Sequence, residues 1–342
     1  MAGPPAAPLA GVAVSGPGVL LATKLHLPRP RPGFVPRPRL VQALSVGLAR
    51  GRVLLCAPAG FGKTALLAAW VQGSQCPVAW LCLDGGDSDP ARFWRYALAA
   101  LDPARPGLAE RVGPLLGPPP PRSFEGLVTA LINDLAAHPA ADEVTLVLDD
   151  YHLIDSGVVH GSVAFLLEHL PPGLRLVLTS RADPPLPLAR LRARGQLAEL
   201  RAAELRFTDQ EAAALLAAVA GPGLPEAAVA ALVAHTEGWA AGLQLAGLSL
   251  RGQADAAGFV AAFSGSHRFV LDYLTDEVLQ RQGGRVREFL LETSVLDRLS
   301  GELCDAVTGR TGSQAMLEQV ERAGLFWVPL DEVRGCCWCR RG

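Results

Sequence analysis

The stretch VLLCAPAGFGKTALL, residues 53–67, joins an apolar run to an amphipathic run through a loop of small residues. The apolar run predicts a buried strand, and the run after the loop predicts a helix that begins near Lys63. Backbone N–H groups of such a loop can surround a phosphate chain, and the positive end of the helix dipole points to the same place. The stretch therefore predicts a strand, a phosphate-binding loop and a helix, in that order.

The residues of this loop have separate expected roles. Lys63 supplies a full positive charge for the phosphates, and Thr64 is placed to ligate Mg²⁺. The usual pattern is G-x-x-x-x-G-K-[ST], and Ala57 stands where its first glycine would be, although the strand-loop-helix context is kept. We predict that the nucleotide-binding residues of the loop are Pro58, Ala59, Gly60, Phe61, Gly62, Lys63 and Thr64.

A second apolar run, 144–148, is followed by two carboxylates, Asp149 and Asp150. A P-loop ATPase needs one carboxylate at such a strand end to hold magnesium and another to orient the attacking water. We predict that Asp149 holds the metal and that Asp150 activates the water. An ordinary turn after a strand would give the same residues, but the phosphate-binding loop upstream favours the catalytic interpretation.

A third apolar run, 174–180, ends at Arg181. In ATPases whose magnesium-binding strand is not the neighbour of the loop strand, a strand of this kind lies between the two. Its tip then faces the γ-phosphate, and we predict that Arg181 is a γ-phosphate sensor. The alternative is a surface ion pair between Arg181 and a residue such as Asp183.

The composition of the chain limits the kinds of protein that it can be. The chain has 342 residues, of which 50% are hydrophobic and 19% charged, which suits a folded protein of two or three domains. Its net charge is −2 and only Lys24 and Lys63 are lysines, so no nucleic-acid footprint is visible. The seven cysteines form no paired framework, and the apolar N-terminus is broken by Pro and Gly without a basic start. We expect a cytoplasmic protein that is not inserted in a membrane.

Strand and helix patterns alternate up to residue 205, and only helical patterns follow. This order predicts an α/β fold with a parallel P-loop NTPase sheet and helices on both of its faces, then an all-helical lid domain and an incomplete winged-helix domain. The Pro-rich segment Pro103–Pro121 is expected to be an exposed loop. We predict a disordered tail over 1–22, the ATPase domain over 23–205, the lid over 206–284 and the partial winged-helix domain over 285–342.

Taken together, these residues resemble the MalT-type regulators of the LuxR family, which are ATP-dependent transcriptional activators and STAND P-loop ATPases. The resemblance covers about Thr23 to Asp331 and rests most on Asp149-Asp150-Tyr151-His152 combined with Gly238-Trp239-Ala240. It implies that Arg37, in the N-terminal arm, borders the nucleotide and that Trp239 belongs to a helical domain closing over it. The alternative for Trp239 is a plain core aromatic.

Family members continue through a helical-repeat sensor and a terminal helix-turn-helix, which are not visible here. The expected return strand of the winged helix is replaced by residues 333–341, VRGCCWCRR, so we expect a truncated member with an unfinished wing. The function expected is an ATP-binding and weakly hydrolysing signal-transduction switch that uses ATP/ADP and Mg²⁺. Nucleotide-dependent self-association and an unknown inducer are implied, and specific DNA binding by this chain is not expected. The alternatives are a non-catalytic nucleotide-binding fragment and a metabolic phosphotransferase.

Overall fold

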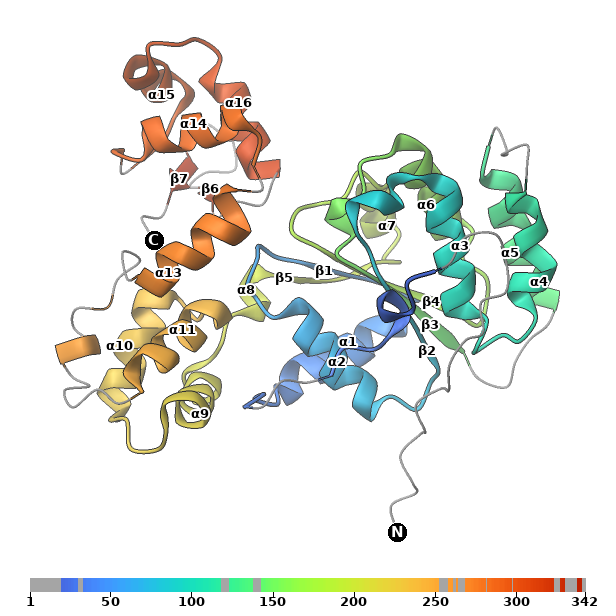
Figure 1. Ribbon diagram of the computed structural model, residues 1–342, viewed down its shortest axis with the longest axis horizontal. Helices are drawn as coiled ribbons and strands as arrows, with labels where there is room; N and C mark the ends of the chain where they lie inside the picture. Colours follow the sequence, from blue (N-terminus) through green and yellow to red (C-terminus); the bar gives the residue numbers. More distant parts are fainter. Residues whose placement is uncertain are drawn as a thin grey trace.

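The protein is described from a computed structural model, which separates into an α/β lobe and a helical part beside it (Figure 1). Residues 1–19 of the predicted tail lie outside the described residues. The short helix η1, Ala22–Leu25, is the first helix described, and the backbone N–H of Leu21 donates to the Tyr96 hydroxyl at 3.0 Å. The structure describes residues 20–29, 33–117, 123–137, 143–251, 258–260, 263, 268–280, 282–296, 298–322, 327–329 and 337–339.

The α/β lobe contains a 5-stranded sheet whose strand order is β2-β3-β4-β1-β5. Each paired neighbour is parallel, as predicted. Strand β4 lies between β1 and β3, which confirms the expected position of the strand that leads to Arg181. Strand β5 was not predicted, because its four residues are only half apolar. The strands are β1 (Arg52–Cys56), β2 (Val78–Cys82), β3 (Val144–Asp149), β4 (Leu174–Ser180) and β5 (Ala198–Arg201).

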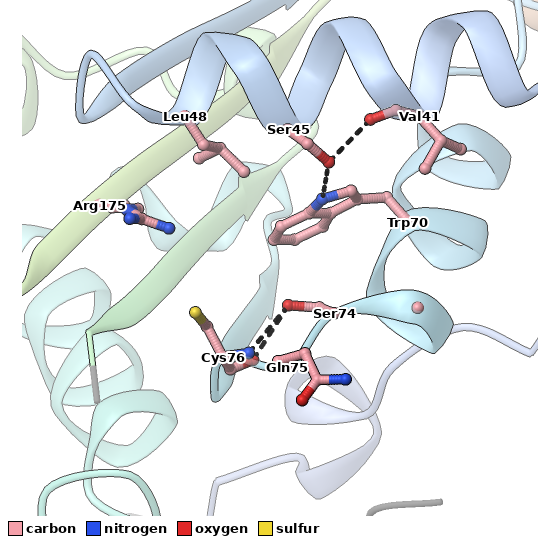
Figure 2. Close-up of a pocket in the computed structure, with 9 residues that line it drawn as sticks. Val41, Ser45, Leu48, Trp70, Ser74, Gln75, Cys76 and Arg175 are labelled. Carbon is pink, nitrogen blue, oxygen red and sulfur yellow. Dashed lines mark hydrogen bonds between the residues drawn. The ribbon is translucent and has the colours of Figure 1, made fainter. Parts of the chain in front are cut away.

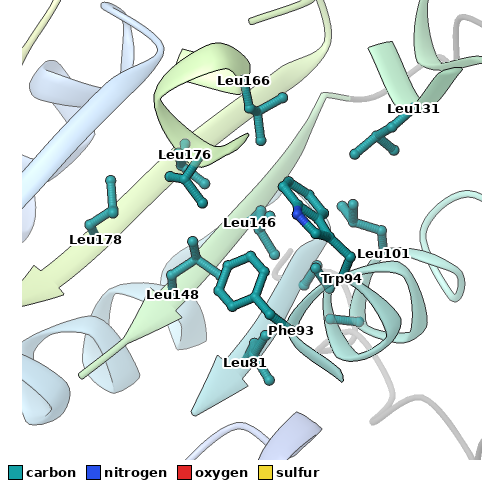
Figure 3. Packing of buried hydrophobic residues seen from close by; sticks show 14 of the residues in the cluster. Leu81, Phe93, Trp94, Leu101, Leu131, Leu146, Leu148, Leu166, Leu176 and Leu178 are labelled. Carbon is teal, nitrogen blue, oxygen red and sulfur yellow. The ribbon is translucent and has the colours of Figure 1, made fainter. Parts of the chain in front are cut away.

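Alternate residues of the central strands enter two different cores, because successive side chains of a strand point to opposite faces. Leu54 and Leu146 face one core with helices α3 (Pro90–Leu101), α5 (Glu125–Ala137) and α6 (Gly157–Glu168). In this core Phe93 and Trp94 lie over Leu146 and Leu148 (Figure 3). Val53 and Val147 face the other core, with α1 (Pro38–Leu48) and α2 (Lys63–Gly73). Helices therefore cover both faces, as predicted.

The expectation of an exposed loop over Pro103–Pro121 is wrong for the part that the structure describes. Residues Leu108–Val112 form helix α4, and Gly113–Leu116 form the short helix η3. Leu108 and Val112 are buried because they stand four residues apart, on one side of a helical turn. Gly107, at φ +80°, allows the chain to enter this helix. Residues 118–121 lie outside the described part.

A helical lid follows the short elements α7 (Leu188–Ala193) and α8 (Ala202–Leu205). Thr208 begins it, and its hydroxyl accepts from the Glu211 N–H at 3.3 Å in the predicted capping box. Buried residues such as Leu216, Leu232 and Leu243 form a core of its own. None of the described helices is long and apolar enough to cross a bilayer. The lid contains α9 (Asp209–Ala220), α10 (Glu226–Thr236), α11 (Ala240–Leu250), α13 (Arg268–Leu274) and the π-helical turn η5 (Thr275–Leu279).

A fourth core joins η5 to the helices that come after it. It contains Val286, Phe289 and Leu317 among others. Strands β6 (Trp327–Pro329) and β7 (Cys337–Cys339) pair in the antiparallel sense, with Trp327 opposite Cys339. The expectation that no return strand forms is therefore wrong, because the Cys-Trp-Cys segment supplies it. The helices are α14 (Gly284–Thr293), α15 (Gly301–Thr308), which was not predicted, and α16 (Ser313–Arg322).

Candidate functional site

The loop between β1 and α2 has the backbone geometry of an anion cradle. Gly60 and Gly62 have φ angles of +77° and +79°, a region that glycine enters without steric cost. Leu66 N–H donates to the Gly62 carbonyl at 2.9 Å, so the N–H groups of the first helical residues remain outside the helical ladder. These groups, at the positive end of the helix dipole, fit a phosphate.

Lys63 stands at the first position of α2 with only 7% of its surface exposed. Its ammonium donates to the carbonyl oxygens of Ala57 and Pro58, the latter at 3.0 Å. Burial lowers the pKa of Lys63 to about 8, the carboxylate of Asp150 opposes that shift, and the charge of Arg181 adds to it. The sheet therefore brings Lys63, Asp150 and Arg181 within electrostatic reach of one another.

The two predicted metal ligands meet beside this lysine. The Thr64 hydroxyl donates to the Asp149 carboxylate, with Oγ1 at 3.0 Å from Oδ2 and 3.2 Å from Oδ1. Burial, followed by the Asp150 charge, raises the pKa of Asp149 to about 6, and hydrogen bonds from Thr179 and Thr64 oppose the rise. Hydroxyl and carboxylate oxygens are the protein ligands that Mg²⁺ prefers, so the pair fits this ion.

Thr179 was not assigned a role from the sequence, yet it bonds to both aspartates, to the side chain of one and the backbone of the other. Its hydroxyl donates to Asp149 Oδ1 at 2.6 Å and accepts from the Asp150 N–H at 2.8 Å. Asp150 has φ +61°, a left-handed conformation that Asp and Asn tolerate better than most residues. The sequence feature that could have indicated this role is a hydroxyl residue near the end of β4, the strand next to the one that carries the carboxylates.

Cys82 also lies at this edge of the sheet, opposite Asp149 in the strand register. One ligand atom each from Cys82, Asp149 and Asp150 lies within 4.8 Å of the others. Burial, helped by the nearby carboxylates, raises the pKa of the Cys82 thiol to about 11. The thiol therefore resists deprotonation more than an exposed cysteine does.

Arg181 reaches across to η5, the last turn of the lid. Its guanidinium donates to the Glu277 carbonyl oxygen at 2.9 Å and to Glu277 Oε2 at 3.0 Å. The alternative ion pair with Asp183 does not form in this structure, since Asp183 pairs with Arg192 and Arg201 instead. Arg181 therefore links β4 to η5, and its role as a γ-phosphate sensor stays a prediction.

Arg37 is buried at the junction between the α/β lobe and the helical lid. Its guanidinium donates to the carbonyl oxygens of Leu205 and Arg206 and to the Glu211 carboxylate. It also stacks over Phe207, 4.1 Å from the ring centroid. These bonds go to residues 205–211, not to the phosphate-binding loop, so Arg37 anchors the junction. That it borders a nucleotide stays a prediction.

A separate cavity of about 220 Å³ lies between α1, α2 and the sheet (Figure 2). Trp70 lines it and donates from Nε1 to the Ser45 hydroxyl at 3.2 Å. Residues 73–76, which precede β2, and Arg175, near the start of β4, close its other side. The cavity is thus near the strand beginnings, at the opposite edge from the phosphate-binding loop.

Comparison with known proteins agrees with this architecture. Residues 275–340 match the family model of the MalT winged helix domain. The serine/threonine-protein kinase PknK of Mycobacterium tuberculosis (strain ATCC 25618 / H37Rv) is 38% identical over 308 residues, which are 89% of this chain and 28% of PknK. The HTH-type transcriptional regulator MalT of Cronobacter sakazakii is 36% identical over 318 residues, 92% of this chain and 35% of that protein.

The chain therefore spans about a third of the length of these curated relatives. Among solved structures, Thermotoga maritima RuvB T158V is similar over 92% of this chain and 96% of its own, with a TM-score of 0.43 and 17% identity. The chain is similar to MalT regulators over 92% of its own length, and residues 275–340 match the MalT winged helix domain.

Proposed function

We propose that the chain binds ATP and ADP with Mg²⁺ and acts as the nucleotide-dependent switch of a MalT-type regulator of the LuxR and STAND class. One observation carries the proposal. The Thr64 hydroxyl and the Asp149 carboxylate meet at 3.0 Å, next to Lys63 and in front of the open N–H groups of α2. This is the donor set that a magnesium-bound nucleoside triphosphate requires.

Each residue then has a definite task. Lys63 binds the β- and γ-phosphates, while Thr64 and Asp149 hold Mg²⁺, which when bound neutralises charge on the phosphate oxygens. Asp150 orients the attacking water and accepts its proton. The Thr179 hydroxyl orients the Asp149 carboxylate through one hydrogen bond. Its other hydrogen bond, from the Asp150 backbone N–H, holds the backbone from which the second carboxylate projects.

Slow hydrolysis would reset such a switch and would not drive metabolism. A nucleotide can shift the arrangement of domains only by binding two arrangements with different affinity. The lid supports this function because it contacts the phosphate-binding loop through Trp239 and Ala241. Nucleotide-dependent self-association and control by an inducer belong to the same proposal.

Calorimetry with ATP and with ADP, each with and without Mg²⁺, tests the proposal. We expect both nucleotides to bind, ATP more tightly with Mg²⁺ present, and phosphate release to be slow. Size-exclusion chromatography in each nucleotide then reports self-association. Binding without phosphate release would favour a non-catalytic nucleotide-binding domain, and no binding of either nucleotide would overturn the proposal.

A further inference from the structure

Arg181 and Glu277 are 96 residues apart in the chain and joined by two hydrogen bonds. Both bonds come from one guanidinium and end on one residue, at its backbone carbonyl and at its carboxylate. The side chains are 20% and 32% exposed, so water only partly screens the ion pair. A planar guanidinium that makes two hydrogen bonds has a fixed orientation.

The segment that carries Glu277 is held at a second place beside the loop. Tyr273, in α13, makes an edge contact with Trp239, with 5.5 Å between ring centroids. Trp239 in turn donates from Nε1 to the Ala59 carbonyl oxygen of the phosphate-binding loop. One continuous segment, 268–279, therefore contacts both Arg181 and the tryptophan that bonds to the phosphate-binding loop. Its last turn, Thr275–Leu279, begins the region that matches the MalT winged helix domain.

We propose that Glu277 is a positioning residue that competes with the terminal phosphate of a nucleoside triphosphate for Arg181. The inference rests on the proposed function. A guanidinium binds carboxylate and phosphate oxygens through the same N–H donors, so the Arg181 Nη2 donor that bonds to Glu277 Oε2 can serve one of these anions at a time. ADP has no terminal phosphate at that position and leaves the Glu277 contact in place. ATP takes the arginine and releases η5, and with it the start of the winged helix domain.

The competition predicts how the two nucleotides respond to loss of the carboxylate. Glu277→Gln removes the charge that ATP must displace, and we expect ATP to bind about 10-fold more tightly, which matches the value of one charge-assisted bond. ADP affinity should stay within twofold of the wild-type value. The ratio of the two affinities is therefore the readout, because a general effect on folding would move both.

The test uses calorimetry on the full chain. Asp276→Asn is the matched control, since Asp276 lies on the same turn and bonds to Gln280. It should leave the ATP:ADP ratio unchanged. In an Arg181→Ala background Glu277→Gln should have no effect on the ratio, as a double-mutant cycle requires for a direct pair. Should Glu277→Gln fail to fold, Glu277→Ala, which also removes the carboxylate, should shift the ratio in the same direction.

An unchanged ratio in Glu277→Gln, or an equal shift in Asp276→Asn, would overturn the inference while leaving the proposed function intact. A shift that persists without Arg181 would overturn it as well. If wild-type protein binds neither nucleotide, the proposed function fails first. The two failures are therefore distinguishable.

Discussion

The indole Nε1 of Trp239 donates a hydrogen bond to the Ala59 carbonyl oxygen over 3.0 Å and across 180 residues of sequence. Ala241 N–H makes a parallel contact with the Gly60 carbonyl, also at 3.0 Å. A Cβ on Gly60 would lie 2.7 Å from the Trp239 nitrogen, which is closer than atoms can approach. The phosphate-binding loop and the lid are therefore fitted to each other, and Trp239 does more than fill a core.

This contact can be tested with Trp239→Phe, which keeps an aromatic ring and removes the N–H donor. We expect the variant to lose about 1 kcal/mol of stability, the usual net value of one hydrogen bond, and to bind ATP about 5-fold more weakly because the loop is less ordered. Urea denaturation and calorimetry measure the two effects. Trp70→Phe is the control, since it removes a comparable bond to Ser45 away from the loop. If both variants weaken ATP binding equally, the contact has no special role.

The loop lysine gives a prediction about affinity. Lys63→Ala deletes charge-assisted bonds to phosphate that are each worth about 1.5–3 kcal/mol, so ATP should bind roughly 10- to 150-fold more weakly. Calorimetry at pH 7 measures this, and a thermal melt checks that the variant folds. Unchanged affinity would refute the assignment of the loop.

Asp150 is expected to act on turnover more than on binding. Asp150→Asn suits the site because Asn also adopts the left-handed conformation found here, at φ +61°. ATP binding should persist, and phosphate release should fall by about 10²- to 10⁴-fold if the carboxylate assists proton transfer. Single-turnover assays and calorimetry on the same sample separate the two quantities. Equal losses of binding and turnover would mean that Asp150 is a structural or metal-binding group.

Tyr151 and His160 give a prediction about pH. The hydroxyl of the fully buried Tyr151 lies 3.0 Å from His160 Nδ1, and burial lowers the pKa of His160 below its ordinary 6.5. At a pH under 6.5 the imidazole takes up a proton in the unfolded chain but resists it in the folded protein. The free energy of unfolding therefore decreases as the pH is lowered. The loss starts near 6.5 and ends once pH drops below the lowered pKa.

Urea denaturation between pH 7.5 and 5.5 measures this loss. His160→Gln should show a flatter pH dependence than the wild type, because the residue that resists protonation is gone. His235→Gln, on the exposed side of α10, is the control and should keep the wild-type slope. A flatter slope in the control alone would contradict the assignment.

Most of the sheet could be predicted because its strands are buried on both faces and read as unbroken apolar runs. The order of β1, β3 and β4 followed from which strand carries the loop, the carboxylates and Arg181. Strand β5 was missed because Glu199 and Arg201 interrupt its apolar pattern. Helix α4 was missed because flanking prolines dominated the local pattern, although two buried residues fix the helix through tertiary packing.

The site could be predicted where its residues belong to motifs at the ends of parallel strands, and less so where single residues make contacts across the fold. Thr64 and Asp149 were expected at one edge of the sheet because strand ends of a parallel sheet meet there, and they lie within hydrogen-bond distance. The Thr179 contacts and the partner of Arg181 come from separate strands and from η5, and no local pattern specifies them. Arg37 was expected near the nucleotide, whereas its bonds hold the junction between the lobes.

The last prediction concerns DNA binding. The wing is not unfinished, since β6 and β7 pair, so the expectation of weak DNA binding depends on charge. The electrostatic argument remains, because the 31 basic residues are offset by 33 acidic ones and the net charge is −2. In the winged helix domain Arg310 is already paired with Glu288 and Glu292 of α14.

We therefore expect the 342-residue chain to bind promoter DNA weakly, without sequence preference, and to lose that binding near 0.15 M salt. Fluorescence anisotropy with a promoter duplex and a scrambled duplex, at several salt concentrations, measures all three properties. Glu288→Gln with Glu292→Gln frees Arg310 and should raise the weak binding slightly and equally for both duplexes, because phosphate contacts carry no sequence information. Nanomolar, sequence-selective binding by the wild-type chain would mean that the helices after Thr208 hold a DNA-reading surface which these charge arguments overlook.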